Sequence, residues 1–229
     1  MIKAVLFDID NTLLDFDAYV KQAMREGFEE FNLIEYDDSM YDTFTRINSG
    51  LWHDIEKGKL TFDELLHIRW NRVFEALGIT FDGYEFEKHF RGKLFTNAIP
   101  VDGAFEILEY LSGRYILATA SNGPYEQQIN RLRVGDMYDR FLHHFISEKI
   151  GASKPSPEFF EYCMNEINKG AEEPIAPYEV MMIGDSLTSD MAGARGFGMK
   201  TCYYDRHGKG TDEKVDYKIR ELLEIRNIL

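Results

Sequence analysis

The stretch AVLFDIDNTLLD occupies residues 4–15 and places two acidic side chains at the end of a short apolar run. The run AVLF is typical of a buried strand, and Asp8 and Asp10 follow it two residues apart. Two carboxylates about 4 Å apart repel each other by roughly 4 kcal/mol at an effective dielectric constant near 20. A nearby cation or a shared proton must offset this repulsion, so the stretch predicts a charged site at the end of a first strand.

Further short apolar runs follow along the chain, and each is preceded by a helix-like segment. They are RYILATA at residues 114–120, HHFIS at 143–147, EVMMIGD at 179–185 and KTCYY at 200–204. Strands that alternate with helices predict a parallel sheet covered by helices on both faces. We therefore expect an α/β fold with a Rossmann-like, three-layer core. One of its helices should begin with Ser156 as N-cap and Pro157 at the first helical position.

The segment between the first and second predicted strands is far longer than a usual crossover connection. Its pattern is helical from Asp15 to Asn97, and Thr61 and Glu64 have the spacing of a capping box. The sequence thus predicts two domains. Residues 1–14 and 98–229 form the α/β core, and residues 15–97 form an inserted, all-helical domain.

Composition narrows the classes of partner. The formal net charge of −14 argues against binding to polymeric nucleic acid, because such proteins concentrate Lys and Arg on one face. No apolar run approaches the roughly 20 residues of a membrane span, and the first residues lack the pattern of a secretory signal. We expect a cytoplasmic protein that does not bind membranes, present as a monomer or weak dimer. The only cysteines, Cys163 and Cys202, are expected to be small buried residues.

Chemically capable residues follow the predicted strands, where a doubly wound sheet binds its ligand. Asp8 and Asp10 follow the first strand, Ser121, Asn122 and Gly123 the second, Lys154 the third, and Asp185 the fourth, with Asp190 at the next helix start. Taken singly, each fits an ordinary role: Lys154 as a solvated loop lysine, Ser121 or Asp190 as a helix cap. Their joint order, DIDNT, SNG, SKPSPEFF and GDSLTSD, is much more specific.

These four motifs, in this order, resemble those of the haloacid dehalogenase superfamily, and the resemblance spans nearly the whole chain, helical cap included. It implies that Asp8 is a nucleophile that takes up a phosphoryl group, and that Asp10 is the general acid and base. It also implies a Mg²⁺ ion held by Asp8, the main-chain carbonyl of Asp10, and Asp185. By this resemblance residues 1–14 and 98–229 are the catalytic core and residues 15–97 the cap.

The same resemblance gives roles to the remaining motif residues. Lys154 would place a positive charge beside the phosphate, and the Ser121 hydroxyl with backbone N–H groups near Asn122 and Gly123 would bind its oxygens. Asp190 would orient Lys154 or a metal-bound water.

Asp10 separates reaction classes within the superfamily. The dehalogenases need neither a metal nor a second aspartate two residues after the nucleophile, so Asp10 favours phosphoryl transfer. Phosphonatase relatives recruit a cap lysine, whereas Lys57 and Lys59 look like exposed loop residues. A phosphomutase shares every core motif and stays open as an alternative. A non-catalytic binding protein is disfavoured, because every chemical position holds the residue type that the mechanism needs.

The helical segment offers candidates for substrate contact. At about 100° per residue, Arg69 falls in the middle of an apolar stripe on its helix, so it must pair either with a buried carboxylate or with a ligand. Asn48 lies inside a similar stripe on the preceding helix and Trp52 at its border. Asn48, Trp52 and Arg69 are therefore candidates for substrate binding. The alternatives are that Trp52 and Trp70 are core residues and that Arg69 forms a structural ion pair.

Residues 47–70, INSGLWHDIEKGKLTFDELLHIRW, resemble the cap of the bacterial pyrimidine 5′-nucleotidase branch of this superfamily. The resemblance implies a small phosphorylated metabolite as partner, a nucleoside monophosphate, and a phosphoric monoester hydrolase activity. The alternative substrates are small sugar phosphates or phosphoglycolate.

Overall fold

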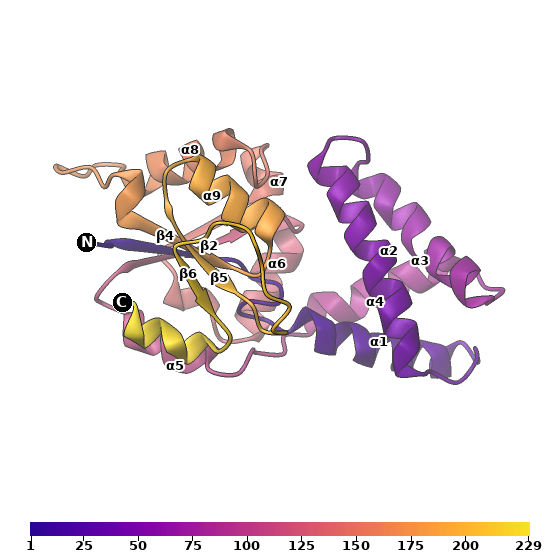
Figure 1. The fold of residues 1–229 in the computed structure, drawn as a ribbon. Coiled ribbons are helices and arrows are strands. Elements are labelled where there is room, and N and C mark those ends of the chain that lie inside the picture. The colour runs from indigo at the N-terminus through magenta and orange to yellow at the C-terminus, as the bar shows by residue number, and fades with distance from the viewer. The chain divides into compact units, whose positions relative to one another are not determined.

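Six parallel strands form the sheet at the centre of the computed structural model, which describes all 229 residues (Figure 1). The strand order is β3-β2-β1-β4-β5-β6. The bounds are β1 (Ala4–Phe7), β2 (Ile116–Ser121), β3 (His143–Ile146), β4 (Val180–Gly184), β5 (Lys200–Tyr204) and β6 (Tyr217–Ile219). The predicted parallel α/β fold is confirmed.

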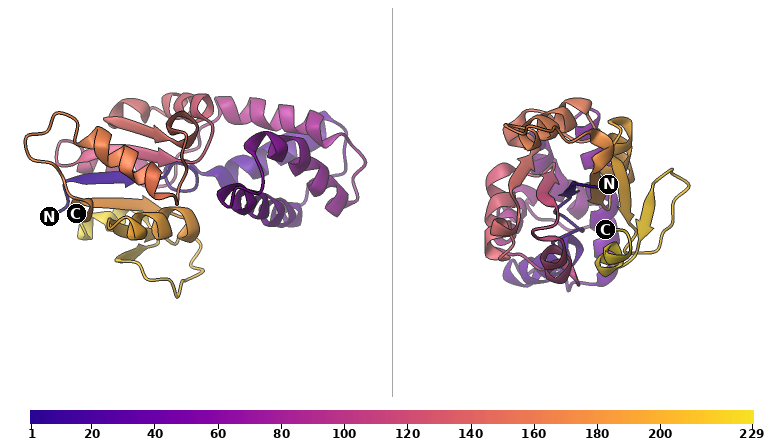
Figure 2. Two further views of the ribbon diagram at one scale, coloured as in Figure 1. Left: turned by 90° about the horizontal axis from the view of Figure 1, so that it is seen from above. Right: turned by 90° about the vertical axis from the view of Figure 1, so that its left-hand side faces the viewer.

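Helices cover both faces of this sheet (Figures 1 and 2). The helices of this part of the chain are α5 (Ala104–Leu111), α6 (Tyr125–Val134), α7 (Ser147–Ile150), α8 (Pro157–Ile167) and α9 (Ala192–Gly196), with short 3₁₀ helices at Tyr138–Arg140, Pro177–Glu179 and Leu222–Asn227. Val5 and Phe7 belong to an apolar cluster with residues of α5 and α6, whereas Ala4 and Leu6 join one with residues of α8 and α9. This alternation along β1 follows from the two-residue period of a strand.

The segment after β4, where the sequence places Asp190 at a helix start, does not form one regular α-helix. Leu187–Met191 forms one turn of π-helix, and only then does α9 begin. The turn is fixed at its start by the Ser186 side chain, which accepts a hydrogen bond from the Ser189 amide. Gly193 lets α9 approach α8, because a Cβ there would lie 2.5 Å from the Phe160 ring and 2.8 Å from Pro155 Cα. Ser156 and Pro157 begin α8 as predicted.

The chain divides into two compact units: one comprises Met1–Asp15 with Ala98–Leu229, and the other Phe16–Asn97. The second unit consists of α1 (Phe16–Glu30), α2 (Asp38–Glu56), α3 (Phe62–Leu77) and α4 (Gly83–Thr96). Its core is rich in aromatic rings, and the fully buried Trp70 packs 4.4 Å from Phe86, centroid to centroid. The predicted capping box of Thr61 and Glu64 is present. None of the helices is both long and apolar enough to cross a membrane.

Candidate active site

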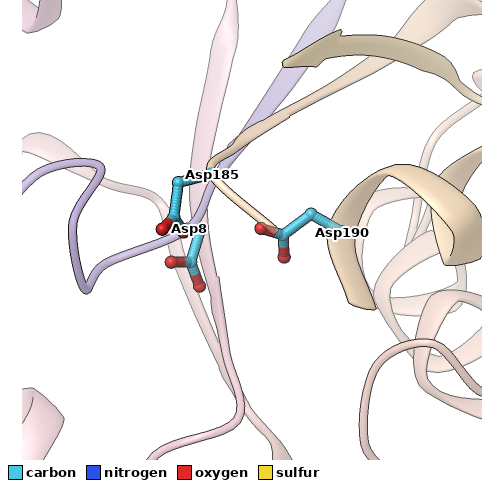
Figure 3. A group of neighbouring side chains, drawn as sticks. All are labelled: Asp8, Asp185 and Asp190. Carbon is cyan, nitrogen blue, oxygen red and sulfur yellow. The ribbon is translucent and has the colours of Figure 1, made fainter. Parts of the chain in front are cut away.

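Three carboxylates converge where β1 and β4 end side by side. Phe7 is in register with Ile183, and the amide of Asp8 donates a hydrogen bond to the Ile183 carbonyl at 2.9 Å. Asp8, Asp185 and Asp190 each bring one carboxylate oxygen to within 4.8 Å of the others, and Figure 3 shows the Asp190 carboxylate directed toward Asp8 and Asp185. The chain crosses from one half of the sheet to the other between these strands, which is where doubly wound sheets bind ligands.

Lys154 lies buried between two of these carboxylates. Its Nζ donates to Asp8 Oδ1 at 2.7 Å, to Asp190 Oδ1 at 2.6 Å and to the Ala120 carbonyl at 2.6 Å. Its side chain is only 2% exposed, so it is not a solvated loop lysine. Two hydrogen bonds between the Asn122 amide group and the Lys154 main chain, at 2.8 and 2.9 Å, fix the loop that carries it.

The charges in this cluster act strongly on one another because water is excluded. Burial raises the pKa of Asp8 to about 7, and the Lys154 cation opposes that rise. Burial lowers the pKa of Lys154, but the carboxylates of Asp190 and Asp8 more than offset this, so its pKa is raised. Lys154 is therefore a permanent cation within the cluster.

Asp190 connects Lys154 to the turn after β4. Its Oδ1 accepts from Lys154, and its Oδ2 accepts from the Ser186 amide at 3.1 Å. A Cβ on Gly184 would lie 2.2 Å from Asp190 Oδ2, so the strand must end in glycine for this carboxylate to reach inward. Of the two predicted roles for Asp190, the contact with Lys154 is the one visible in the structure.

The Asp10 carboxylate is held by two residues of α6 that sequence reasoning missed. Arg131 Nη1 lies 2.5 Å from Asp10 Oδ1, and Gln128 Nε2 donates to Asp10 Oδ2 at 2.8 Å. The one signal was position, because α6 follows the SNG motif directly. The apolar pattern of α6 does not point to Arg131, which at about 100° per residue lies roughly 160° around the helix from Ile129.

Ser121 ends β2 as a buried hydroxyl with two donors. The Gly123 amide donates to Ser121 Oγ at 3.1 Å and Gln128 Nε2 donates at 2.8 Å. The Gly123 amide donates to Ser121, and binding of phosphate by the backbone N–H groups near Asn122 and Gly123 stays a prediction. Because a hydroxyl that accepts two hydrogen bonds keeps its own hydrogen to donate, Ser121 can still donate to a bound anion.

In the helical unit, Arg69 is paired within the protein. Its Nε and Nη2 bind Glu87 at 3.0 and 2.5 Å, and its Nη1 donates to Asn48 Oδ1 at 3.1 Å. Arg69 and Glu87 are both buried. Arg69 therefore has the buried carboxylate partner that was the alternative to a ligand, whereas contact of Asn48 or Trp52 with substrate stays a prediction. The half-buried Trp52 ring packs 5.8 Å from the Phe62 ring, and Lys57 and Lys59 are exposed.

Removing Arg69 should therefore destabilise the helical unit. We expect Arg69→Met to lower its free energy of unfolding by about 3–5 kcal/mol, because the Glu87 carboxylate is left buried without a cation. Urea unfolding followed by tryptophan fluorescence reports on this unit specifically, since Trp52 and Trp70 are the only tryptophans. The double variant Arg69→Met, Glu87→Met should recover most of the loss. Wild-type stability in Arg69→Met would contradict the structural role.

Comparisons with known proteins agree with this arrangement. The model of the haloacid dehalogenase-like hydrolase family matches residues 2–198. The HAD-hydrolase YfnB of Bacillus subtilis is 34% identical over 99% of this chain and 95% of its own. The pyrimidine 5′-nucleotidase PynA of Streptococcus pneumoniae is 32% identical, over 90% of this chain and 84% of its own.

Two further matches extend over the full length. The glyceraldehyde 3-phosphate phosphatase of Pyrococcus furiosus is 30% identical over 100% of this chain and 93% of its own. The crystal structure of YfnB, described as bound to magnesium, superposes with a TM-score of 0.88 and covers 100% of this chain and 98% of that one. The chain is thus an enzyme that belongs to the haloacid dehalogenase-like hydrolase family.

Proposed function

We propose that this enzyme is a Mg²⁺-dependent phosphomonoester hydrolase that works through an aspartyl-phosphate intermediate on Asp8. The observation that carries the proposal is the cluster of Asp8, Asp185 and Asp190 around the buried Lys154. Lys154 neutralises one of three negative charges, which leaves a surplus that suits a divalent cation. Carboxylate oxygens are also the ligands that Mg²⁺ prefers.

Asp8, Asp185 and the main-chain carbonyl of Asp10 would hold the ion. When bound, Mg²⁺ supplies positive charge that offsets the charge of the phosphate and of the clustered carboxylates. The relative YfnB has a structure described as bound to magnesium, which supports this assignment.

The protein residues then divide the reaction into two displacements. A carboxylate oxygen of Asp8 attacks phosphorus, the ester P–O bond breaks, and Asp10 gives its proton to the leaving oxygen. In the second displacement Asp10 takes a proton from water, the water oxygen attacks phosphorus, and the bond from Asp8 to phosphorus breaks. Lys154 and the Ser121 hydroxyl stabilise the charge on the phosphoryl oxygens.

We further propose that the substrate is a nucleoside 5′-monophosphate with a pyrimidine base, and that the helical unit serves as the cap over its leaving group. The relative PynA, named as a pyrimidine 5′-nucleotidase, and the cap-like sequence at residues 47–70 support this substrate class. A triose phosphate is the second candidate, because the Pyrococcus furiosus relative is named as a glyceraldehyde 3-phosphate phosphatase.

A substrate panel tests this proposal. We expect phosphate release from UMP and dTMP at least about tenfold faster than from glyceraldehyde 3-phosphate or phosphoglycolate at equal subsaturating concentration, which corresponds to about 1.4 kcal/mol of discrimination. EDTA should abolish phosphate release, because without a metal ion the carboxylate cluster lacks its compensating positive charge. Added Mg²⁺ should restore release. Preference for glyceraldehyde 3-phosphate would be consistent with the proposed mechanism but would contradict the proposed nucleotide substrate. Full activity in EDTA would contradict the proposed requirement for Mg²⁺.

A further inference from the structure

Two buried side chains of α6 donate hydrogen bonds to the carboxylate of Asp10, one to each oxygen. Arg131 binds Oδ1 and Gln128 binds Oδ2, and the two are joined by a hydrogen bond from Arg131 Nη1 to Gln128 Oε1 at 2.9 Å. We propose that Arg131 and Gln128 are positioning residues that hold Asp10 in place for proton transfer to the leaving oxygen and from water. This inference rests on the proposed role of Asp10 as acid and base.

The solvent exposures of Arg131 and Asp10 indicate that Arg131 positions Asp10 and does not itself bind substrate. The Arg131 side chain is 1% exposed, whereas that of Asp10 is 33% exposed. Arg131 is thus shielded from solvent, whereas the Asp10 carboxylate that it binds is accessible. Each carboxylate oxygen has two lone pairs, so one hydrogen bond to each leaves capacity for proton transfer on the exposed side.

The helix that carries Arg131 and Gln128 is packed into the core of the α/β unit. Ile129 and Leu132, which flank Arg131 on α6, belong to the apolar cluster that also contains Val5 and Phe7 of β1. Burying a guanidinium costs several kcal/mol even when it is paired, so the pairing of Arg131 with Asp10 is weak evidence of a role in stability. Fixing the orientation of a charged partner is a function that an apolar side chain could not provide.

Gln128 also couples Asp10 to the proposed phosphate site. The same Nε2 donates to Asp10 Oδ2 and to Ser121 Oγ, each at 2.8 Å. Gly123 leaves room for this amide, because a Cβ there would lie 2.8 Å from Gln128 Cδ. One side chain therefore sets the spacing between the acid and the hydroxyl that would bind the phosphoryl group.

The dependence of rate on the leaving group tests this role. A nucleoside leaves as an alkoxide and needs a proton, whereas p-nitrophenolate leaves without one. We expect Arg131→Met to slow single-turnover cleavage of UMP about 100-fold, at the low end of what acid–base catalysis contributes. The first release of p-nitrophenol from p-nitrophenyl phosphate should change less than about fivefold. Later turnovers should be slow, because attack by water still needs Asp10 as base.

Four variants complete the experiment. Arg133→Met is the matched control, because Arg133 is an exposed arginine of the same helix and should behave as wild type. Asp10→Asn defines the full effect of losing the acid. Gln128→Met removes the hydrogen bond to Asp10 Oδ2 and should likewise slow cleavage of UMP more than that of p-nitrophenyl phosphate. It therefore tests the proposal even where Arg131→Met does not fold. Arg131→Lys should recover part of the UMP rate.

The outcomes separate this inference from the proposed function. Slowing restricted to the nucleoside ester, with the melting temperature near that of wild type, would support positioning. Equal slowing of both esters, or none, in an active enzyme would overturn positioning and leave the proposed function standing. A wild-type enzyme that releases phosphate from no ester would overturn both.

Discussion

Replacing Asp8 by Asn should reduce phosphate release by at least about 10⁴-fold, in the range seen when other enzymes lose a nucleophile. An amide cannot form the acyl phosphate that the proposed mechanism requires. The fold should survive, because Asn has nearly the same shape and its Oδ1 can still accept from Lys154. Lys154 also keeps its partner Asp190. The measurement is phosphate release from UMP together with the melting temperature of each protein.

Trapping the intermediate makes this test independent of the steady-state rate. Acid quenching during turnover, followed by mass spectrometry, should find a phosphoryl group on the peptide that contains Asp8 in wild type and none in Asp8→Asn. Asp139→Asn, an exposed aspartate of the same unit, should match wild type in both measurements. Turnover within tenfold of wild type in Asp8→Asn would show that another group attacks phosphorus.

The convergence of the carboxylates could be predicted because it depends on a regular feature of the fold. The carboxyl ends of parallel strands share one edge of the sheet, so Asp8 after β1 and Asp185 after β4 were expected at the same edge. The strand order, which places β1 beside β4, makes them neighbours. Strand identification needed only short apolar runs separated by helical segments. Lys154 followed from its position soon after a third strand, although its burial did not.

The partners of the two buried arginines could not be predicted, for a physical reason. The sequence shows that Arg69 needs an anionic partner, but Glu87 lies on a different helix, and which faces meet depends on how α3 packs against α4. Arg131 reaches Asp10 across 121 positions of sequence through the packing of α6. The π-helical turn that aims Asp190 at Lys154 rests on contacts within the turn itself, such as the Ser186 cap, which an alternation of strands and helices does not specify.

Replacing Lys154 by Met should destabilise the α/β unit and inactivate the enzyme. The variant leaves the carboxylates of Asp8 and Asp190 buried near each other without a cation. Breaking a buried ion pair in this way costs about 3–5 kcal/mol of the free energy of unfolding. Loss of a fixed positive charge beside the phosphate should lower kcat by about 10²–10³-fold.

Calorimetry in EDTA and in Mg²⁺ tests whether charge is the cause. In EDTA the calorimetric transition of the α/β unit should move down, while the tryptophan-reported unfolding of the helical unit stays in place, because both tryptophans lie there. Mg²⁺ should recover part of the loss, since a cation that binds only the folded carboxylates stabilises by mass action.

Acidification should also reduce the loss of stability in Lys154→Met, because protonated Asp8 carries no charge that needs a cation. Burial already raises the pKa of Asp8 to about 7, and removing Lys154 takes away the cation that opposes this rise. Lys149→Met, at an exposed lysine of the same unit, should change neither transition. If Lys154→Met were as stable as wild type in EDTA at neutral pH, the buried carboxylates would not need Lys154, and its contribution would be confined to the phosphoryl group.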